Sequence, residues 1–109
     1  MKVERKVEGQ WMPVLAVDQA AGVVYLAGTS PRNTDGEKGI PLWKSSDPGV
    51  TFGNPLIVRE DITSSDKPWI AVDNAPGTGQ HDVYLGCIGT VNTTNALWLS
   101  VSTEGYGTN

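Results

Sequence analysis

The stretch PVLAVDQAAG at residues 13–22 recurs as PWIAVDNAPG at residues 68–77, an offset of 55 residues with six of the ten positions identical. Two further matches follow in the same order: Val24-Tyr25-Leu26 recurs as Val83-Tyr84-Leu85, and Leu42-Trp43 with Ser45 recurs as Leu97-Trp98 with Ser100. The four residues gained between the first and second matches are lost again before the third, so the length differences fall between apolar stretches, as expected for loops. The chain of 109 residues therefore contains two copies of one structural unit.

Each copy has the pattern of short β-strands. Residues 14–17 are apolar throughout, which is typical of an innermost strand covered on both faces. Further strands are predicted at residues 23–28, 40–45 and 54–59, separated by turn-forming clusters at residues 18–22, 30–39, 46–49 and 61–67. No stretch shows helical periodicity. The sequence thus predicts an all-β fold with four antiparallel strands per repeat of 55 residues, the arrangement of two β-propeller blades. A two-sheet sandwich stays open as the alternative, although it does not require the halves to resemble each other.

Between the third and fourth predicted strands, residues 45–52 read SSDPGVTF and have the form S-x-D-x-G-x-T-aromatic. This motif resembles the Asp box, or BNR repeat, of sialidase-like β-propellers, and the resemblance covers nearly the whole chain. Asp47 is expected to accept hydrogen bonds from turn N–H groups, Gly49 to adopt a backbone angle closed to other residues, and Phe52 to pack as an apolar plug. The five defining residues, Ser45, Asp47, Gly49, Thr51 and Phe52, are therefore predicted to be structural.

The second copy ends in a degenerate form of this motif. Residues 102–109 keep the Ser and Thr but have Glu104, Tyr106 and Asn109 at the other defining positions, and they begin two residues late relative to the repeat. The repeat also aligns residues 56–62 with residues 1–7. The predicted organisation is therefore an outer strand at 1–7, a first blade at 13–59, and a second blade at 68–109 that lacks its own outer strand.

Two blades do not close a propeller ring, which usually has four to eight. The chain is therefore expected to be a partial propeller within a longer protein, or one part of an oligomeric ring. Its partners are then the remaining blades or identical chains.

The resemblance also implies where a ligand binds. Successive turns of antiparallel strands lie at alternate ends of a blade, and in sialidase-like proteins the end opposite the Asp box holds the ligand. Loops are predicted at that end at residues 29–39 and 89–95. The candidate ligand-loop residues there are Trp11, Arg32, Asn33, Asp35, Glu37, Asn92, Thr94 and Asn95. Trp11 is a candidate stacking platform for a sugar. The alternative is that all of these are ordinary solvated loop residues.

Hydrolysis of terminal sialic acid is the enzymatic activity that the resemblance implies, and it needs three arginines, an acid/base carboxyl and a tyrosine nucleophile. The chain has three arginines in all, and Arg5 and Arg59 fall in predicted outer strands. Tyr25 and Tyr84 are repeat-equivalent and are predicted to be core residues. We assign no catalytic residue and expect a non-catalytic propeller segment of a carbohydrate-interacting extracellular protein. The alternatives are a fragment of an exo-α-sialidase or related glycoside hydrolase, and a two-bladed lectin that assembles as a ring.

Composition excludes other classes of function. Eight basic and 12 acidic residues give a net charge of -4, which argues against nucleic acid as a partner. No apolar run reaches the roughly 18–20 residues needed to span a bilayer, and the charged first residues do not form an export signal. A secreted or periplasmic parent protein is nevertheless expected from the resemblance.

The titratable residues indicate structural roles. The single cysteine, Cys87, lies among apolar neighbours and is predicted to be a buried thiol. Asp18 and Asp73 end the two innermost strands at equivalent positions and are expected to cap the turns that follow. His81 is expected to be an exposed loop residue. No metal site and no cofactor are predicted.

Overall fold

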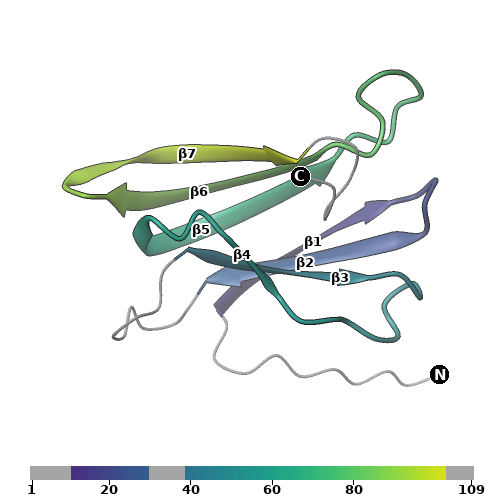
Figure 1. Cartoon of the computed structure of the whole chain (residues 1–109), viewed down its shortest axis with the longest axis horizontal. Coiled ribbons are helices and arrows are strands. Elements are labelled where there is room, and N and C mark those ends of the chain that lie inside the picture. The colour runs from purple at the N-terminus through teal and green to yellow at the C-terminus, as the bar shows by residue number, and fades with distance from the viewer. Residues whose placement is uncertain (1–10, 30–38, 103–109) are drawn as a thin grey trace.

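The computed structural model describes residues 11–29 and 39–102, and the side chains of all these residues except Trp11, Met12 and Ser64. Within them lie seven strands and no helix: β1 Trp11–Asp18, β2 Val23–Thr29, β3 Ile40–Ser45, β4 Leu56–Val58, β5 Ile62–Val72, β6 Val83–Val91 and β7 Thr94–Ser102. They form two antiparallel sheets in sequential order, β1-β2-β3-β4 and β5-β6-β7 (Figure 1). The predicted all-β class is thereby confirmed. The predicted outer strand at residues 1–7 lies outside the described residues.

The strands of the first sheet follow the sequence prediction closely, with one exception. Strands β2 and β3 match their predicted bounds to within one residue, and β1 extends the predicted apolar run at both ends. The fourth strand is shorter than predicted, because only Leu56–Val58 pair with β3. Pro55, directly before it, has no N–H group to donate to a ladder.

Two predictions for the second sheet are wrong. Residues 61–67 were expected to form a turn, but β5 begins at Ile62 and pairs with β6 through two register irregularities on either side of Asp66. Residues 89–95 were expected to form a loop, but β6 and β7 continue through them as a hairpin whose turn is Asn92-Thr93. Asn92 has a φ of 55°, which suits the tight turns that join hairpin strands.

The core lies between the two sheets. On the first sheet the buried side chains are those of Val23, Tyr25, Ala27, Ile40 and Leu42, and on the second those of Ile62, Ile70, Val83, Leu85 and Cys87. Strand β5 lies against β1 and β2, so the first strands of the two sheets are close neighbours at the centre of the molecule (Figure 1). The Cys87 thiol is buried, as predicted, and burial raises its pKa.

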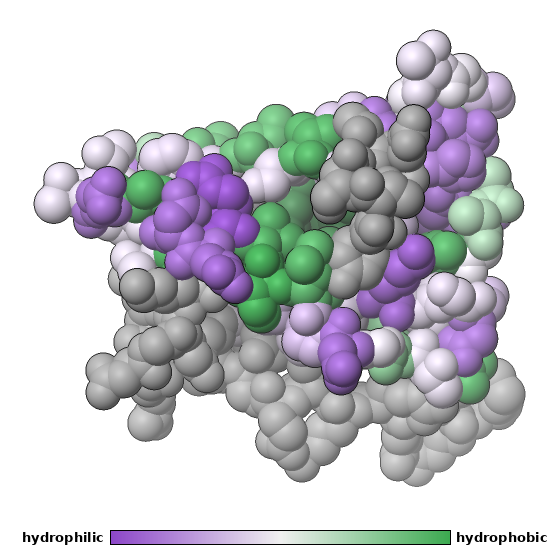
Figure 2. Space-filling view, in the orientation of Figure 1, coloured by the Kyte–Doolittle hydropathy of each residue, from purple (hydrophilic) through white to green (hydrophobic). Residues whose placement is uncertain are grey.

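Both sheets also have an apolar face that points away from this core. On the first sheet Leu15 is 64% exposed, and Val17 beside it is also exposed. On the second sheet the exposed residues of this face are Trp69, Ile88, Leu97, Leu99 and Val101, with Leu97 78% exposed. We call these the first and second outer faces. In Figure 2 apolar surface runs along the β6–β7 region as well as into the hollow between the sheets.

The third strands of the two sheets are offset by two residues from the predicted alignment. Trp43 pairs with Leu26 in the first sheet, whereas Trp98 pairs with Cys87 in the second. Ser45 pairs with Val24, and the residue in the matching place opposite Val83 is Ser102. The expected equivalence of Trp43 with Trp98 is therefore wrong by two residues, whereas the late start of the second Ser motif fits the strand pairing.

Candidate functional site

The turns of the two sheets gather at two opposite ends of the stack. One end carries the β1–β2 turn, the corner between β3 and β4, and the long β5–β6 loop. The other end carries the β6–β7 turn and the β4–β5 connection. We call them the corner end and the opposite end, and they correspond to the two ends that the sequence predicts for structural and ligand-binding turns.

The corner end is organised by the S-x-D-x-G-x-T motif. Ser45 is fully buried, its hydroxyl donates to Oδ1 of Asp47 at 2.8 Å, and its Oγ accepts the N–H of Gly49 at 2.8 Å. Asp47 also accepts the N–H of Thr51 at 2.8 Å and the Thr51 hydroxyl at 2.5 Å. Gly49 has a φ of 85°, a conformation that favours glycine. The Asp47 carboxylate is thus used by the corner's own donors.

These hydrogen bonds lower the pKa of the Asp47 carboxyl group. The hydroxyl and the backbone N–H of Thr51, with the hydroxyl of Ser45, lower the pKa of Asp47 from 3.8 to about 2. A carboxylate whose pKa is lowered by folding contributes stability above its unfolded pKa, and that contribution is lost as the pH falls toward the folded value. The corner is therefore expected to be intact at neutral pH and to weaken between about pH 4 and pH 2.

We expect Asp47→Asn to lower stability at pH 7 and to flatten the decline in stability between pH 4 and pH 2. The reason is that an amide lacks the second acceptor oxygen that Thr51 uses. Urea unfolding at a series of pH values measures both effects. Glu60→Gln, an exposed carboxylate outside the corner, is the matched control and should keep the wild-type decline. If Asp47→Asn keeps it too, the corner is not the group that titrates.

Side chains of the β5–β6 loop join the two sheets at the corner end. The buried Asp18 carboxylate accepts the N–H of Ala21 and lies 2.5 Å from Nδ1 of His81. Asn74 accepts the N–H of Gln19 and donates to the carbonyl of Val17. His81 was expected to be an exposed loop residue, but it is half-buried, because the four-residue insertion in the second copy brings it across to the first sheet.

Removal of this contact has a predictable cost. His81→Ala leaves Asp18 buried with one described hydrogen-bond partner fewer, and we expect a loss of about 1–2 kcal/mol in the free energy of unfolding. This expected loss in the free energy of unfolding is smaller than that for a fully buried ion pair, because the His81 side chain is 39% exposed. Thr78→Ala, an exposed position in the same loop, should change stability by less than about 0.5 kcal/mol. Equal effects of the two substitutions in chemical denaturation would show that the loop, and not the His81 contact, joins the sheets.

The opposite end presents the described part of the predicted ligand surface. Asn92, Thr94 and Asn95 are exposed around the β6–β7 turn. The other candidates, Arg32, Asn33, Asp35 and Glu37, and the side chain of Trp11, lie outside the described residues. The structure thus brings three of the predicted residues together on one hairpin.

A cluster that sequence reasoning did not identify lies between the sheets near this end. Arg59 makes two hydrogen bonds to the Asp61 carboxylate, at 2.8 and 2.9 Å, and its guanidinium lies 5.1 Å from the centre of the Trp98 ring. The Trp98 indole N–H donates to the carbonyl of Gly89 at 2.8 Å. The bond from Arg59 lowers the pKa of Asp61. The spacing Arg-x-Asp was the only local signal in the sequence, and it does not reveal a tryptophan 39 positions away.

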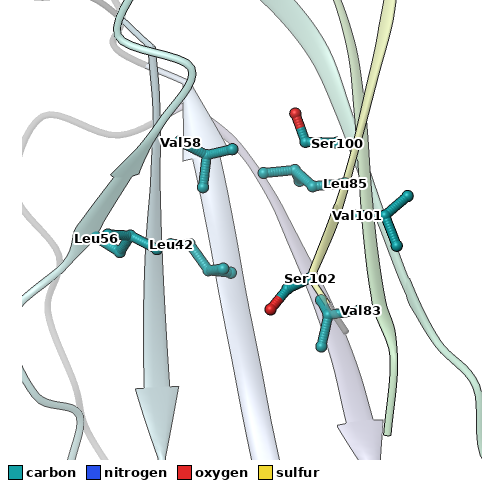
Figure 3. Close-up of a pocket in the computed structure, with 8 residues that line it drawn as sticks. All are labelled: Leu42, Leu56, Val58, Val83, Leu85, Ser100, Val101 and Ser102. Atoms are coloured by element: carbon teal, nitrogen blue, oxygen red, sulfur yellow. The ribbon is translucent and has the colours of Figure 1, made fainter. Parts of the chain in front are cut away.

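An apolar groove of about 240 Å³ opens between the sheets, away from β1 and β5. In Figure 3 Leu42, Leu56 and Val58 of the first sheet point toward Leu85 and Val83 of the second. Ser100 and Ser102 are on the second wall, whereas Val101 points away from it. The groove has few polar groups and no catalytic constellation, so it is a widening of the interface between the sheets.

The described residues hold neither a metal cluster nor a membrane-spanning helix. In residues 11–29 and 39–102, no three His, Cys, Asp or Glu side chains come together as a metal site requires. None of the described segments is a helix long and apolar enough to cross a membrane.

Comparisons with known protein families, with curated proteins and with solved structures yield no match for this chain.

Proposed function

We propose that this chain is a non-catalytic segment of a sialidase-like Asp-box β-propeller, made of two adjacent blades of a carbohydrate-interacting extracellular protein. The observation that carries the proposal is that the strands of the two sheets pair in matching registers, while the sheets pack together through non-equivalent faces. The motif at Ser45–Thr51, described above, adds the chemical signature of the family that the sequence resembles.

The matching register supports two copies of one blade. In the first hairpin Val14 pairs with Ala27, Leu15 with Leu26, Ala16 with Tyr25 and Val17 with Val24. In the second hairpin the repeat-equivalent residues pair in the same way: Trp69 with Gly86, Ile70 with Leu85, Ala71 with Tyr84 and Val72 with Val83. The third strands pair at matching places with the shift of two residues described above, since Leu42 pairs with Ala27 where Leu99, and not Leu97, pairs with Gly86.

The faces that meet in the core support a rotational arrangement. Tyr25 of the first sheet is 2% exposed and faces the second sheet, but its counterpart Tyr84 lies on the second outer face. Leu85 of the second sheet is 4% exposed and faces the first, but its counterpart Leu26 lies on the first outer face. Opposite faces of the repeat therefore pack together. This is the relation between successive propeller blades, whereas a two-fold sandwich would bury the same face of both copies.

The exposed outer faces support the same arrangement. In an isolated two-sheet sandwich the outward residues of each strand are polar, so that apolar and polar positions alternate. Here Leu97, Leu99 and Val101 follow the polar Asn95 among the outward positions of β7, and the outward positions of β1 include Leu15 and Val17. Strands that are apolar on both faces are expected in blades that have a neighbour on each side.

The carbohydrate part of the proposal depends on the opposite end. Amide and hydroxyl groups of Asn92, Thr94 and Asn95 are exposed there, and these are suitable partners for sugar hydroxyls. Asp47, at the corner end, is occupied by Ser45 and Thr51 and is not available as a catalytic acid. Arg59 is held by Asp61 and Trp98. The described residues therefore favour binding over hydrolysis.

A glycan panel together with a fluorogenic sialoside tests this function. We expect the wild-type chain to bind a subset of glycans and to release no fluorophore. The double variant Thr94→Ala with Asn95→Ala should weaken binding at least tenfold, whereas Ser46→Ala at the corner end should leave it unchanged. Absence of binding to every glycan would contradict the carbohydrate proposal. Turnover of the sialoside would contradict the non-catalytic one and favour the glycosidase alternative.

A further inference from the structure

We propose that the second outer face of this chain binds the first outer face of a second copy, so that copies join head to tail. This inference rests on the proposed blade arrangement and adds a partner to it. The contact between the two sheets within the chain is the model for this contact between copies, because it already joins surfaces that correspond to the two outer faces.

The correspondence holds residue by residue. Inside the chain, Tyr25, Ala27 and Leu42 of the first sheet face the second sheet. Their counterparts on the second outer face are Tyr84, Gly86 and Leu99. In the other direction, Ile70 and Leu85 face the first sheet, and their counterparts on the first outer face are Leu15 and Leu26. Each outer face thus has the pattern of a surface whose partner is known from the same molecule.

The chemistry of the two faces is compatible with burial. The outward strand positions of the first sheet, 15, 17, 24, 26, 28, 41, 43 and 45, include no Asp, Glu, Lys or Arg. The same is true of positions 69, 71, 84, 86, 88, 97, 99 and 101 of the second sheet, whereas Asp66, the β5 residue that pairs with Ile88, is an exposed carboxylate next to this face. The one charged residue that the first sheet directs toward the core from β3, Lys44, corresponds to Val101 on the second outer face. Contact between copies would therefore leave no charge from these positions unpaired.

The second outer face has a large exposed aromatic side chain, that of Trp69, which lies against its own sheet. A Cβ placed on Gly86 would lie 3.3 Å from Cε3 and 3.9 Å from Cζ3 of Trp69, so the six-membered ring of the indole occupies the space next to Gly86. Trp69 is nevertheless 60% exposed. A large aromatic side chain held against its own sheet with its other face open is typical of the buried centre of an interface.

A contact between two different surfaces has a direction, and this direction determines how many copies can join. The two surfaces differ, so a dimer still presents one first outer face and one second outer face and can add further copies. Because propellers close with four to eight blades, a ring of two-blade copies contains two to four chains.

Light scattering coupled to size exclusion, with matched variants of the full chain, tests the inference. We expect the wild type and Val50→Glu, a charge placed on the corner away from both outer faces, to form assemblies of two to four copies. Leu15→Glu on the first outer face and Leu99→Glu on the second should each reduce association about 100-fold and run as monomers of 11.6 kDa. Circular dichroism checks that both variants keep their β-structure.

Mixing the two monomeric variants separates a head-to-tail contact from a like-to-like one. Leu15→Glu retains an intact second outer face and Leu99→Glu an intact first one, so an equimolar mixture should form dimers. The inference is overturned if the mixture stays monomeric, or if only one of the two substitutions disrupts the wild-type assembly. A monomeric wild type overturns it as well, but leaves the blade proposal standing, since blades of the same or another chain would then cover these faces.

Discussion

Tyr25→Ala is expected to lower the free energy of unfolding by about 3–5 kcal/mol, the range for removing a large aromatic side chain from a core. Tyr25 is 2% exposed and is the largest of the side chains that are almost completely buried between the sheets. Its loss leaves a cavity on the surface where the first sheet meets the second. Since small domains are stable by only about 5–15 kcal/mol, this change removes a large part of the total stability.

Tyr84→Ala is the matched control, because Tyr84 pairs with Ala71 as Tyr25 pairs with Ala16. Tyr84 lies on the second outer face and is half-buried. We expect its replacement to cost about 1 kcal/mol in urea unfolding at a concentration low enough to keep the chain monomeric. Equal costs for the two tyrosines would mean that both copies bury the same face, and the proposed rotational relation would then be wrong.

Gly39→Ala is the second substitution with a large expected effect. Gly39 has a φ of 76°, and a Cβ built there would lie 2.6 Å from the carbonyl oxygen of Val58 and 2.8 Å from that of Arg59. Its N–H donates to the carbonyl of Ile62 at 2.7 Å, so it joins the first sheet to the start of the second. Because backbone atoms block the Cβ and cannot move aside alone, we expect a loss of about 3 kcal/mol or more.

Gly22→Ala controls for the backbone angle alone. Gly22 has a φ of 68°, but a Cβ there meets no atom within 4 Å. The expected cost is about 1–2 kcal/mol, the penalty for a left-handed conformation. A cost at Gly39 no larger than at Gly22 in the same denaturation experiment would show that the crowding around Gly39 is relieved without loss of stability.

The strands that repeat were predictable, since each is marked by a short local run of apolar, β-branched and aromatic residues. Residues 14–17 and 23–28 read as strands from the sequence and form β1 and β2, and the apolar surroundings of Cys87 correctly indicated a buried thiol. The S-x-D-x-G-x-T spacing was also sufficient to predict a turn, because all its hydrogen bonds join residues within four positions of each other.

The start of β5 was not predictable from local propensity. Ser, Asp and Lys at residues 64–67 are turn-forming, but the structure accommodates them as irregularities of a strand while burying Ile62. The pairing of Ile62 with Val91 thus outweighs the local preference. Gly89 misled in the same way, because it was expected to begin a loop but lies in β6, where Ile62 takes the space of a side chain.

Of the candidate site, the sequence predicted that Asn92, Thr94 and Asn95 lie at the end opposite the Asp47 corner, as they do, but the predicted long loop is a two-residue hairpin turn. Two contacts that join the sheets, between Asp18 and His81 and between Arg59 and Trp98, could not be predicted from the sequence. These pairs are 63 and 39 positions apart, so they depend on how one sheet packs on the other and leave no local pattern.

Which faces of the two sheets meet is tested most directly by a nuclear Overhauser spectrum of the monomeric Leu99→Glu variant, with the rings of Tyr25 and Tyr84 assigned. If opposite faces of the repeat pack together, we expect cross-peaks from the Tyr25 ring to methyl groups of the second sheet, such as those of Ile70 and Leu85, and none from the Tyr84 ring to the first sheet. Cross-peaks between the sheets from both rings would show that like faces meet, and would contradict the arrangement of two successive blades.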